Sequence, residues 1–589
     1  VSLKRAKITD MTDLSDTLIA FDRSSFLNSE NRFSTIGTGF IGGKAHGLAR
    51  IQKLINSTDL KDKFNSIDIG IPAMAVIQTD VFDAFMKRNK LYDIALSGLP
   101  DDRIAHAFQK AALPSEILGD LRTLIGQVHL PLAIRSSSML EDAMHEPFAG
   151  IYGTKMTPNN QVDTTTRFNK LVEAIKYVYA STFFKAARDY MKATKHSSED
   201  EKMAVIIQEV VGQRYGNRFY PECAGVARSR NFYAFGNASP TDGIVSLALG
   251  LGKTVVDGGL VWSYSPAYPK ADPPVGSVFD LMKITQTQFW AVGMGPAPAY
   301  NPVKETEYLT SHSIEDVEED KSLRWVASTL DASSGRLVMG VGKKGGRVLN
   351  FAPLLRLDDI PFNDLIIELL HICERTYEAT VEIEFALSIV AGKKPRFGFL
   401  QVRPMVVSTE EIDVTQDELT QPEVLCASPS VLGNGTNNEI LDIIYMKPGV
   451  FDASLTQKIA LEIEKINNRL THATKPYLLI GFGRWGTSDA WAGIPVNWGQ
   501  ISGAKAIVEA PLAGMNSELS QGSHFFHNVT SFRVLYFSIP YSGEFPIHWD
   551  WLNQQQVVSE TDSIKHVELK KPLFIKVDGR TGRGVIKFT

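Results

Sequence analysis

The segment 380–405, "TVEIEFALSIVAGKKPRFGFLQVRPM", carries acidic, amide and basic side chains at strand-like spacing. Apolar residues alternate with Glu382 and Glu384, which predicts a half-buried strand with both carboxylates on one face. Gln401 and Arg403 share a face of the next strand. A hairpin would bring these four groups together, and such carboxylates suit Mg2+ held jointly with substrate phosphates. The alternative is a solvated sheet face with ion pairs.

A second segment, "PLAIRSSSMLEDAMHEPFAGIYGT" (131–154), places a guanidinium at the end of an apolar strand. Arg135 is followed by three serines, the acidic pair Glu141 and Asp142, and a loop with two glycines. A guanidinium fork beside hydroxyls and a glycine-containing loop can clamp a polyphosphate. A surface arginine in a serine-rich loop is the ordinary alternative.

A third segment, "FSTIGTGFIGGKAHGLARI" (33–51), holds four glycines between positions 37 and 43, directly before Lys44. Such a loop lets backbone N–H groups close on an anion, and the lysine favours phosphate. The G-x-G-x-x-G match does not follow a buried strand, and Thr38 and Ala45 break the P-loop pattern. "LGLGKTVV" also lacks the first P-loop glycine. A plain tight turn is the alternative.

The composition is that of an ordinary globular chain. Of 589 residues, 44% are hydrophobic and 22% charged, with a net charge of −5 and a pI near 6.2. This balance argues against a nucleic-acid partner held by a strong positive field. We find no apolar run long enough to span a membrane and no signal sequence, and the three cysteines lie far apart. The expected location is cytoplasmic, without a membrane partner.

The order of patterns along the chain predicts four regions. A polar lead-in covers 1–35, alternating strand and helix patterns cover 36–407, an acidic linker covers 408–424, and a second block covers 425–589. "LPLAIRSSS" and "MAVIIQEVV" read as buried strands. The spacing of apolar residues over 168–194 predicts one long amphipathic helix.

Several of these motifs occur together in one known family. "GGKAHGLARI", "AIRSSSMLED…FAGIYGT", "MAVIIQEVVG", "GVARSRN" and "VEIEFAL…FLQVRP" resemble, in the same order, the ATP-binding part of phosphoenolpyruvate synthase and pyruvate phosphate dikinase. The resemblance spans about 36–407. It implies an ATP-grasp fold with ATP between two α/β subdomains, within an α/β and α+β multidomain chain, and ATP and Mg2+ as cofactors.

The resemblance also implies roles for individual residues. Lys44 and Arg135 would bind ATP phosphates, Glu382 and Glu384 would hold Mg2+, and Gln401 and Arg403 would line the transfer site. "IIQEVVG" would form the hinge that meets adenine. "LALGLGKTVVDGG" resembles a family segment that reads Gly-Leu-Gly-Glu, with Lys253 in place of the acidic residue. The further nucleotide contacts implied are Gln208, Glu209, Val211, Gly250 and Gly252.

The second block resembles the family's swivelling phosphohistidine domain at both flanks, "IPVNWGQISGAKAIVEA" (494–510) and "PLFIKVDGRTGRGVIKF" (572–588). Between them, "SQGSHFFHNVTSF" offers His524 as the carrier, although Phe525 and Phe526 stand where the family has alanines. Ser523 is expected to cap a helix that begins at His524. The helix dipole would then lower the imidazole pKa and stabilise a phosphoryl group.

Two other interpretations of His524 stay open at this point. It could be a buried or capping histidine, or it could bind a metal together with His527, three residues later. In "GFGRWGTSDAWAGIP" (481–495), Arg484, Trp485, Asp489 and Trp491 could form a pocket for an acceptor or simply fill a core.

These observations predict an ATP-dependent, dikinase-like phosphotransferase in which His524 takes phosphoryl from Mg-ATP. The expected partners are ATP and a small-molecule or protein acceptor, with a homodimer left open. No segment resembling the family's pyruvate-binding barrel is found, so a complete phosphoenolpyruvate synthase is not expected. The alternatives are a non-catalytic ATP-binding regulatory module and an ATP-grasp kinase or ligase that transfers phosphoryl directly.

Overall fold

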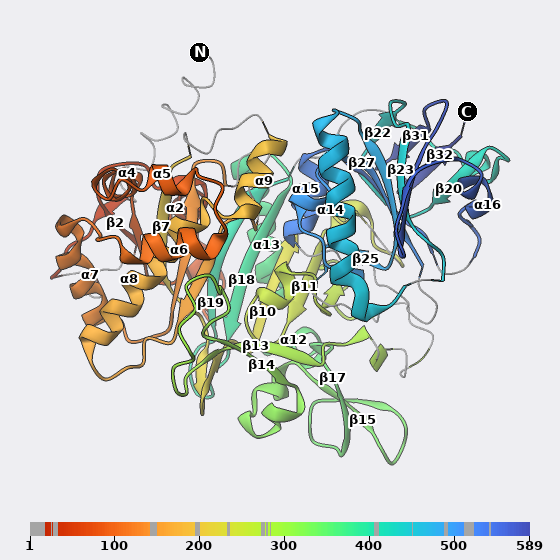
Figure 1. Ribbon diagram of the computed structural model, residues 1–589. Helices are drawn as coiled ribbons and strands as arrows, with labels where there is room; N and C mark the ends of the chain where they lie inside the picture. The colour runs from red at the N-terminus through yellow and green to blue at the C-terminus, as the bar shows by residue number, and fades with distance from the viewer. Residues whose placement is uncertain are drawn as a thin grey trace.

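A computed structural model describes residues 18–24, 26, 33–141, 150–194, 201–232, 236–271, 277, 281–282, 284–405, 412–449, 451–487, 493–511, 523–540 and 543–588. The chain forms a mixed α/β structure with several sheets. Figure 1 shows an N-terminal region (red to orange), a central sheet (yellow to teal), a small β extension below it (green), and a C-terminal unit (blue) on the far side.

The first sheet is mixed and six-stranded, and it contains the two buried strands expected from "LPLAIRSSS" and "MAVIIQEVV". Its order is β1-β2-β4-β7-β5-β6. β1 and most of β2 lie within the expected polar lead-in. β2 is buried and directly precedes Gly37, so the glycine loop does follow a buried strand, contrary to the sequence expectation. The strands are β1 (Ile19–Ala20), β2 (Phe33–Ile36), β4 (Met74–Ile77), β7 (Met203–Glu209), β5 (Leu132–Ser138) and β6 (Thr154–Thr157).

Helices cover both faces of this sheet. On one face an apolar core joins the sheet to α4 (Thr79–Arg88), α6 (Asp101–Lys110), α7 (Ser115–Gln127) and α8 (Thr164–Ser181). On the other face lies α2 (Gly42–Ser57), which also contacts β19 of the second sheet. Because α2 touches both sheets, its first turn sits between them. The short helices α3 (Leu60–Lys63) and α5 (Tyr92–Ala95) complete this region.

The stretch 168–194 forms two helices instead of the single long helix expected. Helix α8 ends at Ser181 and α9 (Lys185–Ala193) begins four residues later. Phe183, in the break, is completely buried, and the N–H of Lys185 is bound by Asp101 at 2.7 Å. Burial of Phe183 and the new cap explain the interruption, which apolar periodicity alone does not reveal.

The second sheet is largely antiparallel and has the order β12-β11-β10-β18-β19-β3. Helix α13 (Phe362–Tyr377) packs on it, together with α12 (Ala352–Arg356) and the short α10 (Lys253–Val256) near its edge. Its strands are β12 (Trp262–Tyr264), β11 (Ile244–Ala248), β10 (Cys223–Arg228), β18 (Val381–Ser388), β19 (Arg396–Pro404) and β3 (Asp68–Gly70).

Two small sheets form the extension at the bottom of Figure 1. One has the order β14-β13-β9-β8, and the other has the order β16-β15-β17. Their strands are β8 (Gln213–Tyr215), β9 (Arg218–Tyr220), β13 (Gln288–Gly293), β14 (Leu309–Ser313), β15 (Ser328–Asp331), β16 (Leu337–Met339) and β17 (Gly345–Val348).

The C-terminal unit is built on a seven-stranded sheet of order β21-β28-β27-β24-β23-β30-β29. Its central strands β23, β24, β27 and β28 are parallel. Helices α14 (Thr456–His472) and α15 (Ser523–Ser531) share an apolar core with one face. The strands are β21 (Val431–Leu432), β28 (Leu535–Ser538), β27 (Ala504–Ala510), β24 (Tyr477–Phe482), β23 (Asp442–Met446), β30 (Ile564–Glu568) and β29 (Gln556–Glu560).

A smaller sheet, β20-β32-β31-β22, closes the other face through a second apolar core. The described part of the expected linker, from residue 412, packs onto this unit: Val414 and Leu419 are buried beside Phe545 and Val585. The remaining elements are β20 (Val424–Ser428), β32 (Arg583–Lys587), β31 (Phe574–Asp578), β22 (Gly435–Asn437), β25 (Arg484–Trp485), β26 (Gly493–Ile494) and α16 (Trp549–Asn553).

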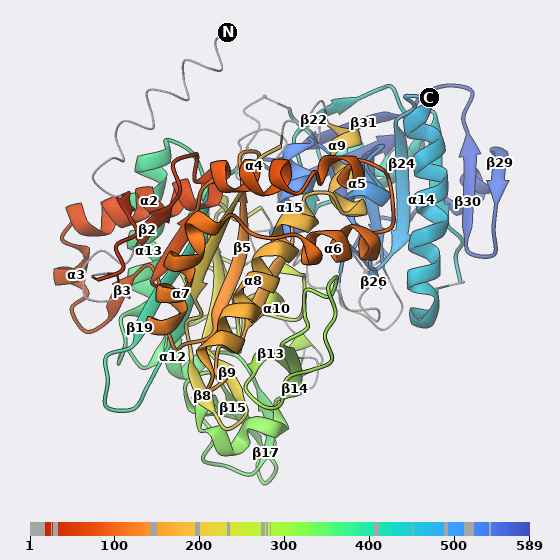
Figure 2. The same ribbon diagram turned by 60° about the vertical axis from the view of Figure 1, so that its left-hand side comes forward.

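The C-terminal unit is docked on the N-terminal region through apolar contacts. One core cluster runs continuously from the helices of the first sheet to α14 and α15. At the junction Tyr190 of α9 meets Phe532 edge-on, with ring centroids 5.4 Å apart, and its hydroxyl lies 3.4 Å from Asn528 of α15. Figure 2 shows the same proximity of α9 and α15 from a second direction. Within the described ranges, no helix has the length and apolarity required to cross a membrane.

Candidate functional site

The hairpin expected over 380–405 forms as β18 and β19. Glu382 lies opposite Arg403 and Glu384 opposite Gln401, while Arg228 of β10 flanks Glu382 on the other side. The strand is not half-buried as expected: Glu382 is fully buried and Arg403 is 2% exposed. A solvated sheet face is therefore excluded. These charges are enclosed because α15 of the C-terminal unit reaches this end of the hairpin.

Arg135 joins the first sheet to this hairpin. Its Nη1 donates to the carbonyl of Leu400 at 2.9 Å and its Nη2 donates to Oε1 of Gln401 at 2.9 Å. The same Nη2 lies 3.9 Å from Glu384, whose other oxygen accepts from Arg403 at 2.6 Å. Two guanidinium groups and one carboxylate thus meet where the two sheets approach each other.

Glu382 has cationic or potentially cationic partners on both oxygens. Arg228 Nε donates to Oε2 at 2.7 Å, and Nε2 of His527, from α15, lies 2.9 Å from Oε1. Burial alone would raise the pKa of Glu382, but His527, Arg228 and Arg403 outweigh it and hold this pKa well below its usual range. Arg228 and His527 thus occupy both carboxylate oxygens of Glu382.

Of the two carboxylates, Glu384, which also has Arg403 and Arg135 beside it, is the more accessible. Its side chain is 12% exposed, whereas that of Glu382 is not exposed at all. The amide oxygen of Gln401 lies on the same strand pair, and both oxygens are hard ligands of the kind that Mg2+ takes together with phosphates. Glu382 instead positions Arg228, Arg403 and His527.

Lys44 is positioned by the first turn of α2. Its ammonium donates to Glu141 Oε1 at 2.7 Å and to Ser136 Oγ at 3.2 Å. Glu141 also accepts from the N–H of Ser138 at 2.9 Å. Lys44 and Glu141 are both buried, so the expected phosphate-binding cation is held in place by a carboxylate that follows the Arg135 strand.

The first N–H groups of the glycine loop before Lys44 are bound by side chains of the protein itself, whereas the sequence analysis expected them to face a phosphate. The N–H groups of Thr38 and Gly39 donate to the Asp80 carboxylate, both at 3.0 Å, and that of Phe40 donates to Thr79. Its glycines serve close packing: a Cβ on Gly42 would lie 1.7 Å from the Ser137 carbonyl oxygen. The loop is a tight turn that brings Lys44 to β5.

The expected adenine hinge lies at the end of β7. Gln208 is buried, and its amide oxygen is 3.4 Å from Arg135 Nη1. Glu209 pairs with Arg396 at 3.4 Å, and its N–H is taken by the carbonyl of Ala73. Val211 packs against β19, where a Cβ on Gly398 would meet it at 2.4 Å. The hinge segment thus borders the same hairpin as Arg135.

The second glycine segment leads to helix α10. Gly250 contacts β13, where a Cβ would come 2.6 Å from the Trp290 carbonyl oxygen, whereas Gly252 is open on its outer side. Lys253 forms an ion pair with Asp257. Helix α10 in turn contacts α15 of the C-terminal unit.

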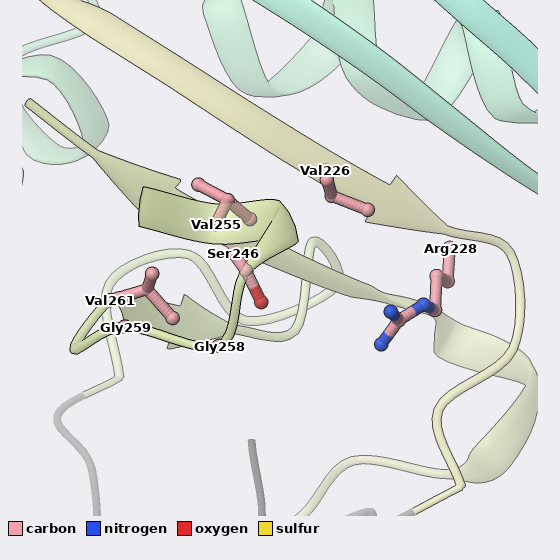
Figure 3. A pocket seen from close by; sticks show the side chains of 7 residues that line it. All are labelled: Val226, Arg228, Ser246, Val255, Gly258, Gly259 and Val261. Carbon is pink, nitrogen blue, oxygen red and sulfur yellow. The ribbon is translucent and has the colours of Figure 1, made fainter. Parts of the chain in front are cut away.

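A small cavity of about 10 Å3, enough for one water molecule, lies beneath α10. It is lined by Val226, Arg228, Ser246, Val255, Gly258, Gly259 and Val261. Figure 3 shows Arg228 at one end of this space and the turn of Gly258 and Gly259 at the other. The cavity is too small for a nucleotide, and it separates the α10 segment from the β10 strand that positions Glu382.

His524 lies on α15, which begins one residue earlier than expected, at Ser523. A Cβ on Gly150, at the end of the Arg135 segment, would come within 2.4 Å of His524 Nδ1. Burial, together with the charges of Arg403 and Lys44, lowers the pKa of His524 to about 3 against the opposing effects of Asp257 and Glu382. The charges that act on this imidazole are therefore those of the N-terminal site.

His527 and Arg484, two other residues that the sequence analysis singled out, lie in different parts of the structure. His527 faces Glu382, and among the described residues no group of three or more His, Cys, Asp or Glu side chains that could hold a metal ion is found. Arg484 and Trp485 are buried in the C-terminal unit. The expected contributions of Asp142, Asp489, Trp491 and Gly522 lie outside the described residues.

Sequence reasoning placed Gly150 in the loop of the expected polyphosphate clamp, but it did not assign Arg228 or Asp257 to the site. Arg228 and Gly150 stand within motifs that carried the family resemblance, so the motif context was a usable signal. Asp257 lies four residues after Lys253, and only the fold reveals its electrostatic effect on His524.

The described residues define a mixed α/β protein of several sheets, with a charged site where two sheets and a helix of the C-terminal unit meet. The chain belongs to the family described as pyruvate phosphate dikinase, AMP/ATP-binding domain, whose model matches residues 38–423. A comparison with curated proteins finds no match. The matched region includes the second sheet and four of the six strands of the first sheet, since β1 and β2 lie before it. It ends one residue before β20, the first strand of the C-terminal unit.

Proposed function

We propose that this protein is an ATP-dependent phosphotransferase of the phosphoenolpyruvate synthase and pyruvate phosphate dikinase type, in which His524 is the phosphoryl carrier. The observation that supports it most directly is the position of His524. A histidine outside the family match lies against Gly150 and within the electrostatic influence of Arg403 and Lys44, which are inside the match. The family description, AMP/ATP-binding, fits a reaction that converts ATP to AMP.

The groups around His524 suit nucleophilic attack on a phosphate chain. An imidazole with a pKa of about 3 is neutral at pH 7 and keeps its lone pair. Because Nδ1 faces Gly150, Nε2 is the nitrogen available to the β-phosphorus. Lys44, Arg135 and Arg403 would offset negative charge on the transferring group, the principal requirement of phosphoryl transfer.

The reaction we propose has two steps. Nε2 of His524 attacks the β-phosphorus of ATP, the bond from that phosphorus to the oxygen bridging it to the α-phosphorus breaks, and AMP leaves. The γ-phosphoryl group then passes to phosphate or water, and the β-phosphoryl group stays on His524 for an acceptor. Mg2+, held by Glu384 and Gln401, would neutralise phosphate charge. The ATP-grasp architecture and a swivelling C-terminal unit are part of this proposal.

The test is labelling of the protein with ATP. With β-labelled ATP we expect acid-labile, base-stable label on the wild-type protein and none on His524→Ala. His527→Ala is the matched control, because His527 lies on the same helix but faces Glu382. Label retained in His524→Ala would refute the carrier, ATP turnover without label would favour direct transfer, and binding without turnover would favour a regulatory module.

A further inference from the structure

The C-terminal unit contains a buried guanidinium, that of Arg484, two of whose nitrogens have no hydrogen-bond partner among the described residues. Arg484 follows the carboxyl end of β24 and is 5% exposed. Within the described part of the chain, its Nε and Nη1 are buried and make no hydrogen bond. A buried charge in this state is strongly unfavourable, whereas an arginine fork is well matched to a carboxylate or phosphate. Two donor nitrogens of the Arg484 side chain therefore lack an acceptor within the described residues.

The nearest acidic influence on Arg484 comes from Glu509 of β27. Glu509 is 4% exposed and accepts from Tyr536 Oη at 2.7 Å and from Ser538 Oγ at 3.5 Å. Burial raises its pKa, although Tyr536, Arg484 and Ser538 oppose this. Within the described part of the chain, no hydrogen bond joins Nε or Nη1 of Arg484 to a carboxylate. Glu509 thus accepts from two hydroxyl groups and forms no hydrogen bond with Nε or Nη1 of Arg484.

Aromatic packing holds this segment in place. A Cβ on Gly481 would lie 2.2 Å from the Trp485 ring, whose Nε1 donates to the Val508 carbonyl at 3.2 Å. Phe525 of α15 packs on Gly486 and meets Tyr536 edge-on at 6.3 Å. The residues on both sides of Arg484 in the chain are therefore held by close aromatic packing.

Arg484 lies at the carboxyl end of the parallel strands of the C-terminal sheet, the end from which the chain continues to α15 and His524. Arg484 follows β24, Glu509 is next to the last residue of β27, and α15 is the next helix after β27 in the chain. Thr487 at this end lies 3.4 Å from the carbonyl of Gly258, in the turn after Asp257. A ligand on Arg484 would therefore be bound by the same unit that carries His524.

We propose that Arg484 binds the carboxylate of a small molecule and that Glu509 accepts or shares a hydrogen bond with a second polar group of that molecule. A singly charged carboxylate matches one guanidinium, whereas a phosphate dianion beside Glu509 would meet a second negative charge. That this molecule is the acceptor of phosphoryl from His524 rests on the proposed function. The proposal that Arg484 binds a carboxylate does not rest on the proposed function.

The test uses the nucleotide-free full chain with sodium acetate as the probe and sodium chloride at equal ionic strength as the baseline. We expect acetate to raise the melting temperature saturably, because a ligand that binds only the folded state stabilises it. In Arg484→Met the acetate Kd should rise at least tenfold. The matched control Lys505→Met, an exposed residue of β27, should bind acetate as the wild type does.

A second variant keeps the proposal testable if Arg484→Met does not fold. Glu509→Gln removes the neighbouring negative charge and should tighten acetate binding severalfold. Acetate that acts no differently from chloride, or equally on wild type and Arg484→Met, would overturn the proposal. Tighter binding of inorganic phosphate than of acetate, lost in Arg484→Met, would overturn the assignment of a carboxylate. None of these measurements uses ATP, so their failure is distinguishable from failure to label His524.

Discussion

His524 of the C-terminal unit and Gly150 of the N-terminal region interlock: a single methyl group on Gly150 would come within 2.4 Å of Nδ1 of the imidazole. Gly150 has a φ of +68°, and it follows the strand that carries Arg135. The docking of α15 is therefore fitted to the backbone of the same segment that supplies a proposed phosphate-binding arginine. A change at Gly150 tests whether this docking matters for chemistry.

We predict that Gly150→Ala reduces labelling of His524 by at least tenfold and leaves ATP binding largely intact. The new methyl group would displace the imidazole of His524. The three atoms nearest to that methyl group all belong to His524, so we do not expect it to displace Lys44 or the β18–β19 hairpin. Gly98→Ala is the control, since Gly98 has a φ of +73° and open space around its Cβ position. Both variants carry about 1 kcal/mol of backbone strain. Equal labelling of both variants would contradict the proposed docking.

Loss of the Lys44 ammonium should affect both stability and nucleotide affinity. Lys44→Met leaves Glu141 buried beside Ser136 without its cation, which we expect to cost about 3–5 kcal/mol of unfolding free energy. Lys44→Met with Glu141→Met should regain most of this stability, as measured by urea unfolding, but not ATP binding, as measured by calorimetry. If the double variant binds ATP normally, Lys44 is a structural residue only.

Glu201 should make stability fall as the pH rises. Burial raises its pKa from 4.5 to about 7, helped by the charge of Glu141. Between these values the folded state holds a proton that the unfolded state has lost, so each pH unit removes up to about 1.4 kcal/mol. The total loss is about 3 kcal/mol.

Glu201→Gln should therefore lose this part of the pH dependence and exceed the wild type in stability at pH 8, with little difference at pH 4.5. Urea unfolding across this range measures the effect. Parallel stability curves for the two proteins would show that Glu201 does not titrate in this way.

The sequence predicted much of the site and less of what encloses it. The alternation around Glu382 and Glu384 identified the strand and its pairing with Gln401 and Arg403, since period-two patterns report local backbone geometry. The burial of Glu382 could not be predicted in this way, because it depends on α15, more than one hundred residues later in the chain.

The glycine loop illustrates a different limit. Four glycines before a lysine are compatible with an anion loop and with close packing, and only the position of Asp80 decides between them. Similarly, the periodicity over 168–194 continues through Phe183, so the pattern alone does not reveal the break between α8 and α9. Both outcomes depend on tertiary partners that a local pattern does not contain.

The last prediction separates the two carboxylates of β18. Glu384→Gln should weaken the Mg2+-dependent part of ATP affinity at least tenfold, because it removes the charged ligand that has exposed surface. In EDTA its ATP affinity should equal or exceed that of the wild type, since one negative charge near the phosphates is gone. Glu382→Gln should leave the Mg2+ titration midpoint nearly unchanged and instead lower the melting temperature, because Arg228 and His527 lose their buried partner. Calorimetric titration of ATP at a series of Mg2+ concentrations, with thermal unfolding of the same samples, measures both effects. A larger shift of the Mg2+ midpoint in Glu382→Gln than in Glu384→Gln would reverse the assignment and make the fully buried carboxylate the metal ligand.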